Sequence, residues 1–261
     1  PNAAASQAYF LLSYVVRIAG ISWLAGKGVN PAGYAALIDI VQRPFPLVGT
    51  LVSSLSTPGL VKSFDQGPPS LAKQLLAQQY NVLLSLSLLL AAALNASLAD
   101  IARFIMPAEF YNEFLHYGSC IIFYYFILFN LQTTSSIFLQ LKRRAFSILA
   151  VAIFILTLSL LVAGVLTYFE FSLFQVVFGV SFVILGGVLV SFILDRPSSY
   201  MAIGLPVLIS IAASGLLSVL SLLLRRQDGF PLLFVLSLSI IAPFGLYILE
   251  YMRRSPRKEL A

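Results

Sequence analysis

The segment AFSILAVAIFILTLSLLVAGVLTY, residues 145–168, indicates the fold class of this chain most clearly. It is a continuous apolar run without a charged residue, and about 20 such residues are enough for a helix to cross a bilayer core about 30 Å thick. A strand of a membrane barrel would instead show about ten residues of alternating polarity. The stretch therefore predicts a transmembrane α-helix.

The same pattern recurs on both sides of this stretch. A window of about 19 residues finds further apolar segments at 8–26, 31–61, 80–106, 113–140, 172–194, 200–224 and 231–252. Of the 261 residues, 59% are hydrophobic and 10% are charged, and the mean hydropathy is +0.95. This composition is typical of proteins that cross the membrane several times. We therefore predict an all-α, polytopic membrane helix bundle with about eight transmembrane helices.

The loops between the predicted spans set the orientation of the chain. Most of its 16 Lys and Arg residues fall on one side of the membrane. That side carries Lys62, Lys73, Lys142, Arg143, Arg144, Arg196, Arg253, Arg254, Arg257 and Lys258, and the other side carries Lys27, Arg103, Arg225 and Arg226. Because positive loops stay inside, both ends are predicted to be cytoplasmic. This asymmetry accounts for the net charge of +6, so we expect no nucleic-acid partner.

Signatures of catalysis are absent from the sequence. It contains no H-E-x-x-H helix, no P-loop glycine series and no pairing of a nucleophile with a base. His116, the only histidine, has no neighbouring Cys or clustered carboxylates to complete a metal site. We expect no enzyme activity, no metal and no cofactor. What remains is secondary transport driven by an ion gradient, the membrane potential or the substrate gradient.

Arg43 is the most informative residue because it lies inside a predicted span, together with Asp39. If Asn30 caps this helix and Pro31 is its first residue, Asp39 lies roughly 12 Å and Arg43 roughly 18 Å from its outer end. The spacing of four places both on one helix face, and Pro46 is expected to kink the helix beside Arg43. A charge at this depth costs about 2.5 kcal/mol or more, so it normally faces a wet cavity or a partner.

Five short segments, taken in order, carry a resemblance to a known family. They are Gly26-Lys-Gly-Val-Asn-Pro-Ala-Gly-Tyr34, Asp39-Ile-Val-Gln-Arg-Pro44, Ser53-Ser-Leu-Ser-Thr-Pro-Gly59, Phe104-Ile-Met-Pro-Ala-Glu-Phe-Tyr111 and Leu139-Gln-Leu-Lys-Arg-Arg144. With these segments, residues 18–195 resemble the second lobe of polysaccharide and lipid-linked oligosaccharide flippases. These flippases belong to the multidrug, oligosaccharidyl-lipid and polysaccharide exporter superfamily.

The resemblance implies a domain organisation. Each lobe of that family is a six-helix bundle, and a pseudo-two-fold axis along the membrane normal relates the two lobes. Residues 1–196 are then expected to form the second lobe, and residues 197–261 two additional transmembrane helices with a basic tail. The chain opens on Pro1 without a basic segment and cleavage site. We interpret it as the interior of a longer protein, whose N-terminal lobe would be its partner.

The resemblance also implies a function. Such a protein flips a polyprenyl-diphosphate-linked saccharide across the bacterial inner membrane for export of O-antigen or exopolysaccharide. The polyprenyl tail would stay in membrane lipid while the diphosphate and sugars pass through a hydrated lumen. Two alternatives stay open, namely a cation-coupled multidrug exporter of the same superfamily and a non-transporting membrane scaffold subunit.

Arg17 and Arg43 are the candidates for binding the diphosphate, because planar guanidinium groups suit bidentate contacts with phosphate oxygens. Alternatively, Asp39 and Arg43 form a pair within one helix that holds the bundle together, while Arg17 reaches toward an interface. Asp39 has a further possible role in binding a proton or Na⁺ during transport.

Polar residues gather toward the inner end of the span at 113–140. Asn130, Thr133, Thr134 and Gln140 share one helix face. They could line a hydrated cavity and bind sugar hydroxyls, or they could hydrogen-bond to neighbouring helices. The basic loop at 142–144 either attracts an anionic head group or only fixes the topology.

Overall fold

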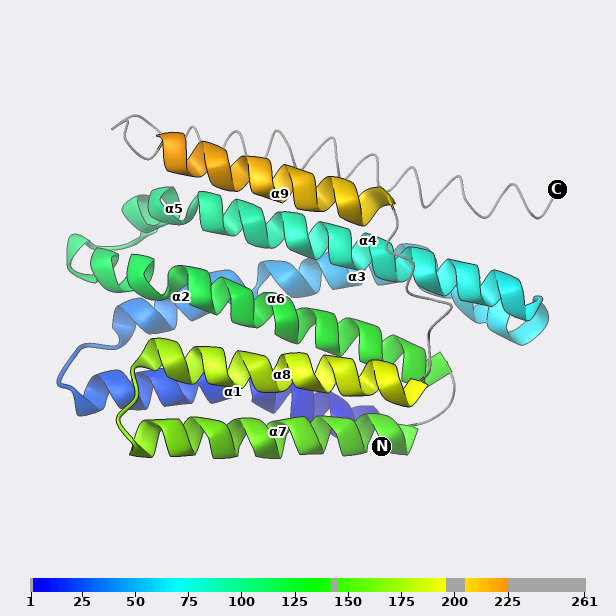
Figure 1. The fold of residues 1–261 in the computed structure, drawn as a ribbon, viewed down its shortest axis with the longest axis horizontal. Helices are drawn as coiled ribbons and strands as arrows, with labels where there is room; N and C mark the ends of the chain where they lie inside the picture. Colours follow the sequence, from blue (N-terminus) through cyan, green and yellow to red (C-terminus); the bar gives the residue numbers. More distant parts are fainter. Residues whose placement is uncertain (1, 142–144, 196–204, 225–261) are drawn as a thin grey trace. The chain divides into compact units, whose positions relative to one another are not determined.

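Helices make up the regular structure of this protein. The computed structural model describes residues 2–141, 145–195 and 205–224, and every regular element in these ranges is helical (Figure 1). The prediction of an all-α helix bundle is confirmed. The predicted span at 231–252 lies outside the described residues.

Long apolar helices dominate the described ranges. Five segments there are long and apolar enough to cross a membrane, namely Gln7–Gly26, Ala32–Ser63, Ser70–Ala96, Ala108–Thr133 and Leu149–Tyr168. The helices at Leu173–Gly187 and Pro206–Leu217 are apolar but shorter within the described part. These helices fit a multi-pass membrane protein.

Contacts among the helices divide the chain into two compact units. Unit 1 takes residues 1–43 and 105–196, and unit 2 takes residues 44–104 and 197–261. This division differs from the predicted one. The prediction groups residues 1–196 as a lobe and residues 197–261 as two additional helices, whereas residues 44–104 cluster here with the C-terminal part. The division into a lobe and two extra helices stays a prediction.

Unit 1 contains the candidate residues Arg17, Asp39 and Arg43. Its elements are α1 (Asn2–Gly26), α2 (Ala32–Gln42), the 3₁₀ helix η1 (Ala108–Phe110), α6 (Tyr111–Leu141), α7 (Ala145–Tyr168) and α8 (Leu173–Asp195). Helix α1 packs against α7, α8 packs against both α6 and α7, and α2 packs against α6 (Figure 1). This packing brings α1, α2 and α6 into mutual contact.

Unit 2 is built around α4. Its described elements are α3 (Pro44–Gln66), α4 (Pro69–Ala96), α5 (Leu98–Ile105) and α9 (Leu205–Leu224). Helix α4 packs against both α3 and α9. The predicted span at 80–106 is therefore two helices, α4 and α5, and they separate at Ser97. The N–H and the hydroxyl of Ser97 both donate to the carbonyl of Ala93, which closes the last turn of α4.

The predicted span at 31–61 corresponds to one apolar segment, Ala32–Ser63, within which the helical hydrogen bonds are broken once. Helix α2 ends at Gln42 and α3 begins at Pro44, so the pattern is interrupted at Arg43. Proline has no N–H, so Pro44 and Pro46 cannot donate to the carbonyls of Ile40 and Gln42. The backbone of Arg43 keeps helical angles, φ −67° and ψ −40°. Its side chain therefore continues the face of α2.

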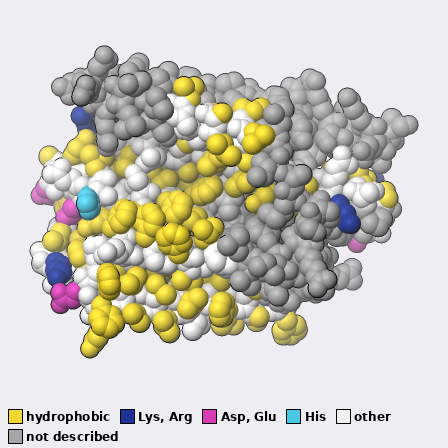
Figure 2. Space-filling model, in the orientation of Figure 1, with side chains coloured by type: hydrophobic (Ala, Val, Ile, Leu, Met, Phe, Trp, Pro, Cys, Tyr) yellow, Lys and Arg dark blue, Asp and Glu magenta, His cyan; other side chains and the backbone are white. Residues whose placement is uncertain are grey.

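The outside of unit 1 is apolar along its helices. Phe154 and Leu161 of α7 are 60% and 58% exposed, and Phe182 of α8 is 61% exposed. Figure 2 shows hydrophobic side chains over the described parts of α6, α7 and α8, with charged side chains at one end. Lys27, which follows the end of α1, pairs with Glu170, which follows the end of α7, at 3.6 Å. Large exposed apolar surfaces between polar ends are typical of helices that face lipid.

Candidate functional site

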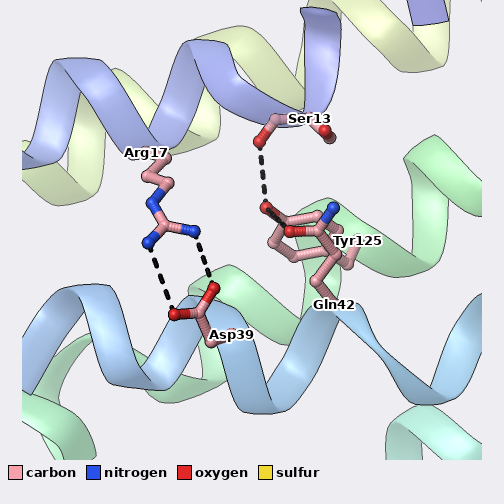
Figure 3. Close-up of polar contacts among 5 residues, drawn as sticks. All are labelled: Ser13, Arg17, Asp39, Gln42 and Tyr125. Carbon is pink, nitrogen blue, oxygen red and sulfur yellow. Dashed lines mark hydrogen bonds and ion pairs between the residues drawn. The ribbon is translucent and has the colours of Figure 1, made fainter. Parts of the chain in front are cut away.

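An ion pair between α1 and α2 lies at the centre of the candidate site. Nη1 of Arg17 donates to Oδ1 of Asp39 at 2.6 Å, and Nη2 donates to Oδ2 at 3.3 Å (Figure 3). Arg17 lies roughly 14 Å before the end of α1, and Asp39 lies roughly 10 Å after the start of α2. Because a short turn joins these helices, the two charges meet at a similar depth, well inside an apolar segment.

This pair replaces the one expected within a single helix. Asp39 is bonded to Arg17, 22 residues away along the chain, and not to Arg43. Two parallel N–H···O bonds hold a carboxylate more strongly than a pair of exposed side chains one turn apart. Arg17, expected in one interpretation to reach an interface, is thus engaged between helices.

The pair is not sealed. The side chains of Arg17 and Asp39 keep 27% and 44% of their surface exposed. A guanidinium has about five N–H donors and a carboxylate about four acceptor positions, and this contact uses only two of each. Within the described part of the chain, the remaining positions have no hydrogen-bond partner. Such groups, placed between apolar helices, require water or a polar ligand.

Arg43 adds a second positive charge near Asp39. Its side chain is exposed, and it follows Asp39 by one turn on the face of α2. Residues four apart on a helix have Cβ atoms roughly 5–6 Å apart. Asp39 therefore has one arginine bound across the helix interface and another within reach along its own helix. The three side chains together carry one more positive than negative charge.

Hydrogen bonds to backbone carbonyls of α1 hold this arrangement in place. Tyr125 of α6 donates its hydroxyl to the carbonyl of Ser13 at 2.9 Å and lies 3.5 Å from Oε1 of Gln42 (Figure 3). The hydroxyl of Tyr124 donates to the carbonyl of Leu12 at 2.5 Å. Both tyrosines are buried. These bonds fix α6 against the turn of α1 that precedes Arg17.

Two further bonds extend this row along α1. The buried Tyr34 of α2 donates to the carbonyl of Val16 at 2.9 Å, and Gln132 of α6 donates to the carbonyl of Tyr9 at 3.1 Å. Tyr34 reaches its acceptor only because Gly20 has no side chain, since a Cβ there would lie 2.2 Å from the tyrosine ring. The acceptors on α1 therefore form one face, at the spacing of successive helical turns.

Two of the polar residues predicted on α6, Asn130 and Thr133, each donate to a carbonyl of their own helix. Nδ2 of the buried Asn130 donates to the carbonyl of Phe126 at 2.8 Å, and the Thr133 hydroxyl donates to the carbonyl of Phe129 at 2.8 Å. The side chains of Thr134 and Gln140 lie outside the described residues, as does the basic loop at 142–144. Whether this face lines a cavity stays a prediction.

The sequence interpretation missed the polar residues that surround the ion pair. Ser13, Gln42 and Tyr125 were not candidates, although all three contribute to the frame around Arg17 and Asp39. One signal was available, because Tyr125 and Gln132 are seven residues apart and so share a face of an otherwise apolar helix. Two donors on one face of a membrane helix indicate bonds to a neighbouring helix.

Metal-binding clusters are not seen in the part of the chain that the structure describes. No three His, Cys, Asp or Glu residues gather there in positions that could hold an ion. The only cysteine, Cys120, is buried and unpaired by a disulfide. The chemistry available at the candidate site is thus the binding of charged groups by Arg17, Asp39 and Arg43.

Comparisons with protein-family models, with curated proteins and with solved structures find no match for this chain.

Proposed function

We propose that this protein is a secondary transporter that flips a polyprenyl-diphosphate-linked saccharide across the bacterial inner membrane. The observation that carries the proposal is the open ion pair of Arg17 and Asp39, with Arg43 one turn away. Arginines kept at depth in apolar helices are costly, by about 2.5 kcal/mol or more for each charge at the bilayer centre. Transport of lipids with negatively charged head groups explains why these arginines are present.

The chemistry of the two arginines suits a diphosphate. Guanidinium groups bind oxyanions through paired N–H donors, and they keep their charge at any physiological pH. Arg43 is exposed, and Arg17 keeps 27% of its side chain exposed, so both are open to a ligand. The polyprenyl tail would remain among the lipids that contact the apolar faces of α7 and α8.

A transport cycle of this kind uses two lobes. In the proposed arrangement this chain supplies the second lobe and two additional helices, and an N-terminal lobe of the same protein completes the lumen. Both ends of the segment are proposed to be cytoplasmic, on the basis of the positive loops. Asn130, Thr133, Thr134 and Gln140 are proposed to meet the sugar hydroxyls.

The proposal is tested by following lipid flipping in proteoliposomes that contain the full-length protein. The probe is a fluorescent polyprenyl-diphosphate-linked N-acetylglucosamine, and a membrane-impermeant quencher reports the outward-facing fraction. Arg43→Ala is expected to slow flipping at least about tenfold, because one charge-assisted contact with the phosphate is lost. Arg43→Lys keeps the charge but not the paired donors, so its flipping rate is expected to lie between those of the native protein and Arg43→Ala.

Lys62→Ala provides the matched control, because Lys62 is an exposed cation near the end of α3. It is expected to flip the probe at the native rate. Unchanged flipping by Arg43→Ala at equal reconstitution would remove Arg43 from the site. If the native protein does not move the probe but does export cationic dyes, the multidrug alternative replaces the present proposal.

A further inference from the structure

We propose that Asp39 is a built-in competitor for the anion site on Arg17. In the unloaded protein its carboxylate occupies the position that a phosphate oxygen pair takes when the ligand binds. This inference rests on the proposed function, and it adds how the same site is emptied and refilled. The ligand class is a diphosphate, whether it is free in water or part of a lipid head group.

On the Nη1/Nη2 edge of Arg17, the carboxylate and a phosphate exclude each other. Asp39 uses Nη1 and Nη2 of Arg17 through two roughly parallel contacts of 2.6 Å and 3.3 Å. A phosphate presents a pair of oxygens to a guanidinium in the same way. The same two donors cannot serve both groups, so a phosphate that takes this edge of Arg17 must displace Asp39.

Charge favours the exchange. A diphosphate esterified at both ends carries about two negative charges, one for each phosphate. Arg17 and Arg43 match this charge only after the carboxylate of Asp39 has moved away. While Asp39 stays bound to Arg17, the ligand meets a like charge at the site. The competitor therefore lowers the affinity of the loaded state and helps to release the ligand.

The surrounding frame permits the pair to open. Within the described residues, Arg17 is the one hydrogen-bond partner of the Asp39 carboxylate. The neighbouring frame is built on other atoms, since Tyr125 bonds to the Ser13 carbonyl and to Gln42. Figure 3 shows these contacts beside the pair but separate from it. Opening the pair thus leaves the bonds that join α6 to α1 in place.

Calorimetric titration of the full-length protein in nanodiscs tests the inference. Inorganic pyrophosphate is the probe in one arm, and geranylgeranyl diphosphate is the probe in the other. The apparent affinity of the native protein is its intrinsic affinity multiplied by the fraction of time that Arg17 is free of Asp39. Asp39→Asn raises this fraction, so it is expected to bind the probe about fivefold tighter than the native protein. Asp65→Asn, which removes an exposed carboxylate of α3, is expected to bind as the native protein does.

The two arms separate the sources of the ligand. Tighter binding of both probes by Asp39→Asn supports a site for any diphosphate, and tighter binding of the lipid probe alone supports a site for head groups. In either arm, Arg17→Gln combined with Asp39→Asn is expected to remove the gain. Equal affinity of Asp39→Asn and the native protein for the probes would overturn the proposal that Asp39 competes with the ligand.

A second measurement needs no substitution. A water-soluble carbodiimide modifies free carboxyl groups, and mass spectrometry of peptides reports the extent of reaction at Asp39. Saturating pyrophosphate is expected to raise the reaction of Asp39 relative to that of the exposed Asp65 in the same sample, because it frees the Asp39 carboxylate from Arg17. The ratio corrects for reagent that reacts with pyrophosphate itself. An unchanged or lower ratio would contradict displacement.

The inference and the proposed function fail in different ways. If Asp39→Asn does not change pyrophosphate binding and lipid flipping is normal, only the proposal that Asp39 competes with the ligand is overturned. Absence of binding by every variant, together with no flipping by the native protein, would overturn the proposed function as well.

Discussion

The two units differ in the polar side chains that lie between their helices and in how these side chains are hydrogen-bonded. Unit 1 places two charged side chains between α1 and α2, where they bind each other and remain partly exposed. Among its described residues, unit 2 buries Ser210, whose hydroxyl donates to a carbonyl of its own helix, together with the Gln79 amide and one carboxylate oxygen of Asp100, which have no hydrogen-bond partner. The described cations of α3 and α4, Lys62 and Lys73, are exposed near helix ends.

This difference separates a binding site from ordinary packing. An uncharged hydroxyl in a membrane helix can be satisfied by the carbonyl four residues earlier, so it does not by itself require a ligand. A guanidinium has too many donors to be satisfied in that way. The ion pair of Arg17 and Asp39 therefore locates the proposed anion site in unit 1.

Reversing one charge of the pair should have the largest effect on stability. Arg17→Asp removes the contact and sets two carboxylates against each other, which should destabilise unit 1 by about 3 kcal/mol after allowance for partial exposure. Equilibrium unfolding in mixed micelles measures the change. Combining it with Asp39→Arg should recover most of the loss, because the pair is then rebuilt in reverse. A double variant as unstable as the single ones would show that the two residues do not interact.

Filling the space beside Tyr34 should have an intermediate effect. Gly20→Ala adds a Cβ 2.2 Å from the ring of a fully buried tyrosine, so Tyr34 must move and lose its bond to Val16. We expect a loss of about 2 kcal/mol in the free energy of unfolding. Gly164→Ala is the matched control, because nothing lies within 4 Å of a Cβ at that position. Equal effects of the two changes would contradict the close packing of α1 and α2.

Removing a single hydroxyl should have the smallest measurable effect. Tyr124→Phe deletes the donor to the Leu12 carbonyl while keeping the ring, and hydrogen bonds between membrane helices average about 0.6 kcal/mol. Ser210→Ala, its counterpart in unit 2, should change stability less, because its bond lies within one helix. The same unfolding assay compares them. A larger loss for Ser210→Ala would reverse the contrast between the units.

The extent of the helices was largely predictable from the sequence. The segments predicted at 145–168 and 172–194 agree closely with α7 and α8, because a long uncharged run has no other stable form in a bilayer. The breaks were harder to predict. Pro46 was expected to kink one helix beside Arg43. The structure places a break in the helical hydrogen bonds there, with α2 ending at Gln42 and α3 beginning at Pro44, because Pro44 and Pro46 both lack an N–H.

Sequence alone determined that this chain is an all-α bundle of apolar helices and that Arg17, Asp39 and Arg43 are charges in unusual places. Those conclusions follow from run length and residue type, which are local properties. The arginine that holds Asp39 is identified by the three-dimensional arrangement of the helices. A local pair with Arg43 and a distant pair with Arg17 are both compatible with the sequence, and the choice depends on how α1 meets α2. Gly20, Tyr34 and Tyr125 set that contact through packing and hydrogen bonds between segments far apart in the chain.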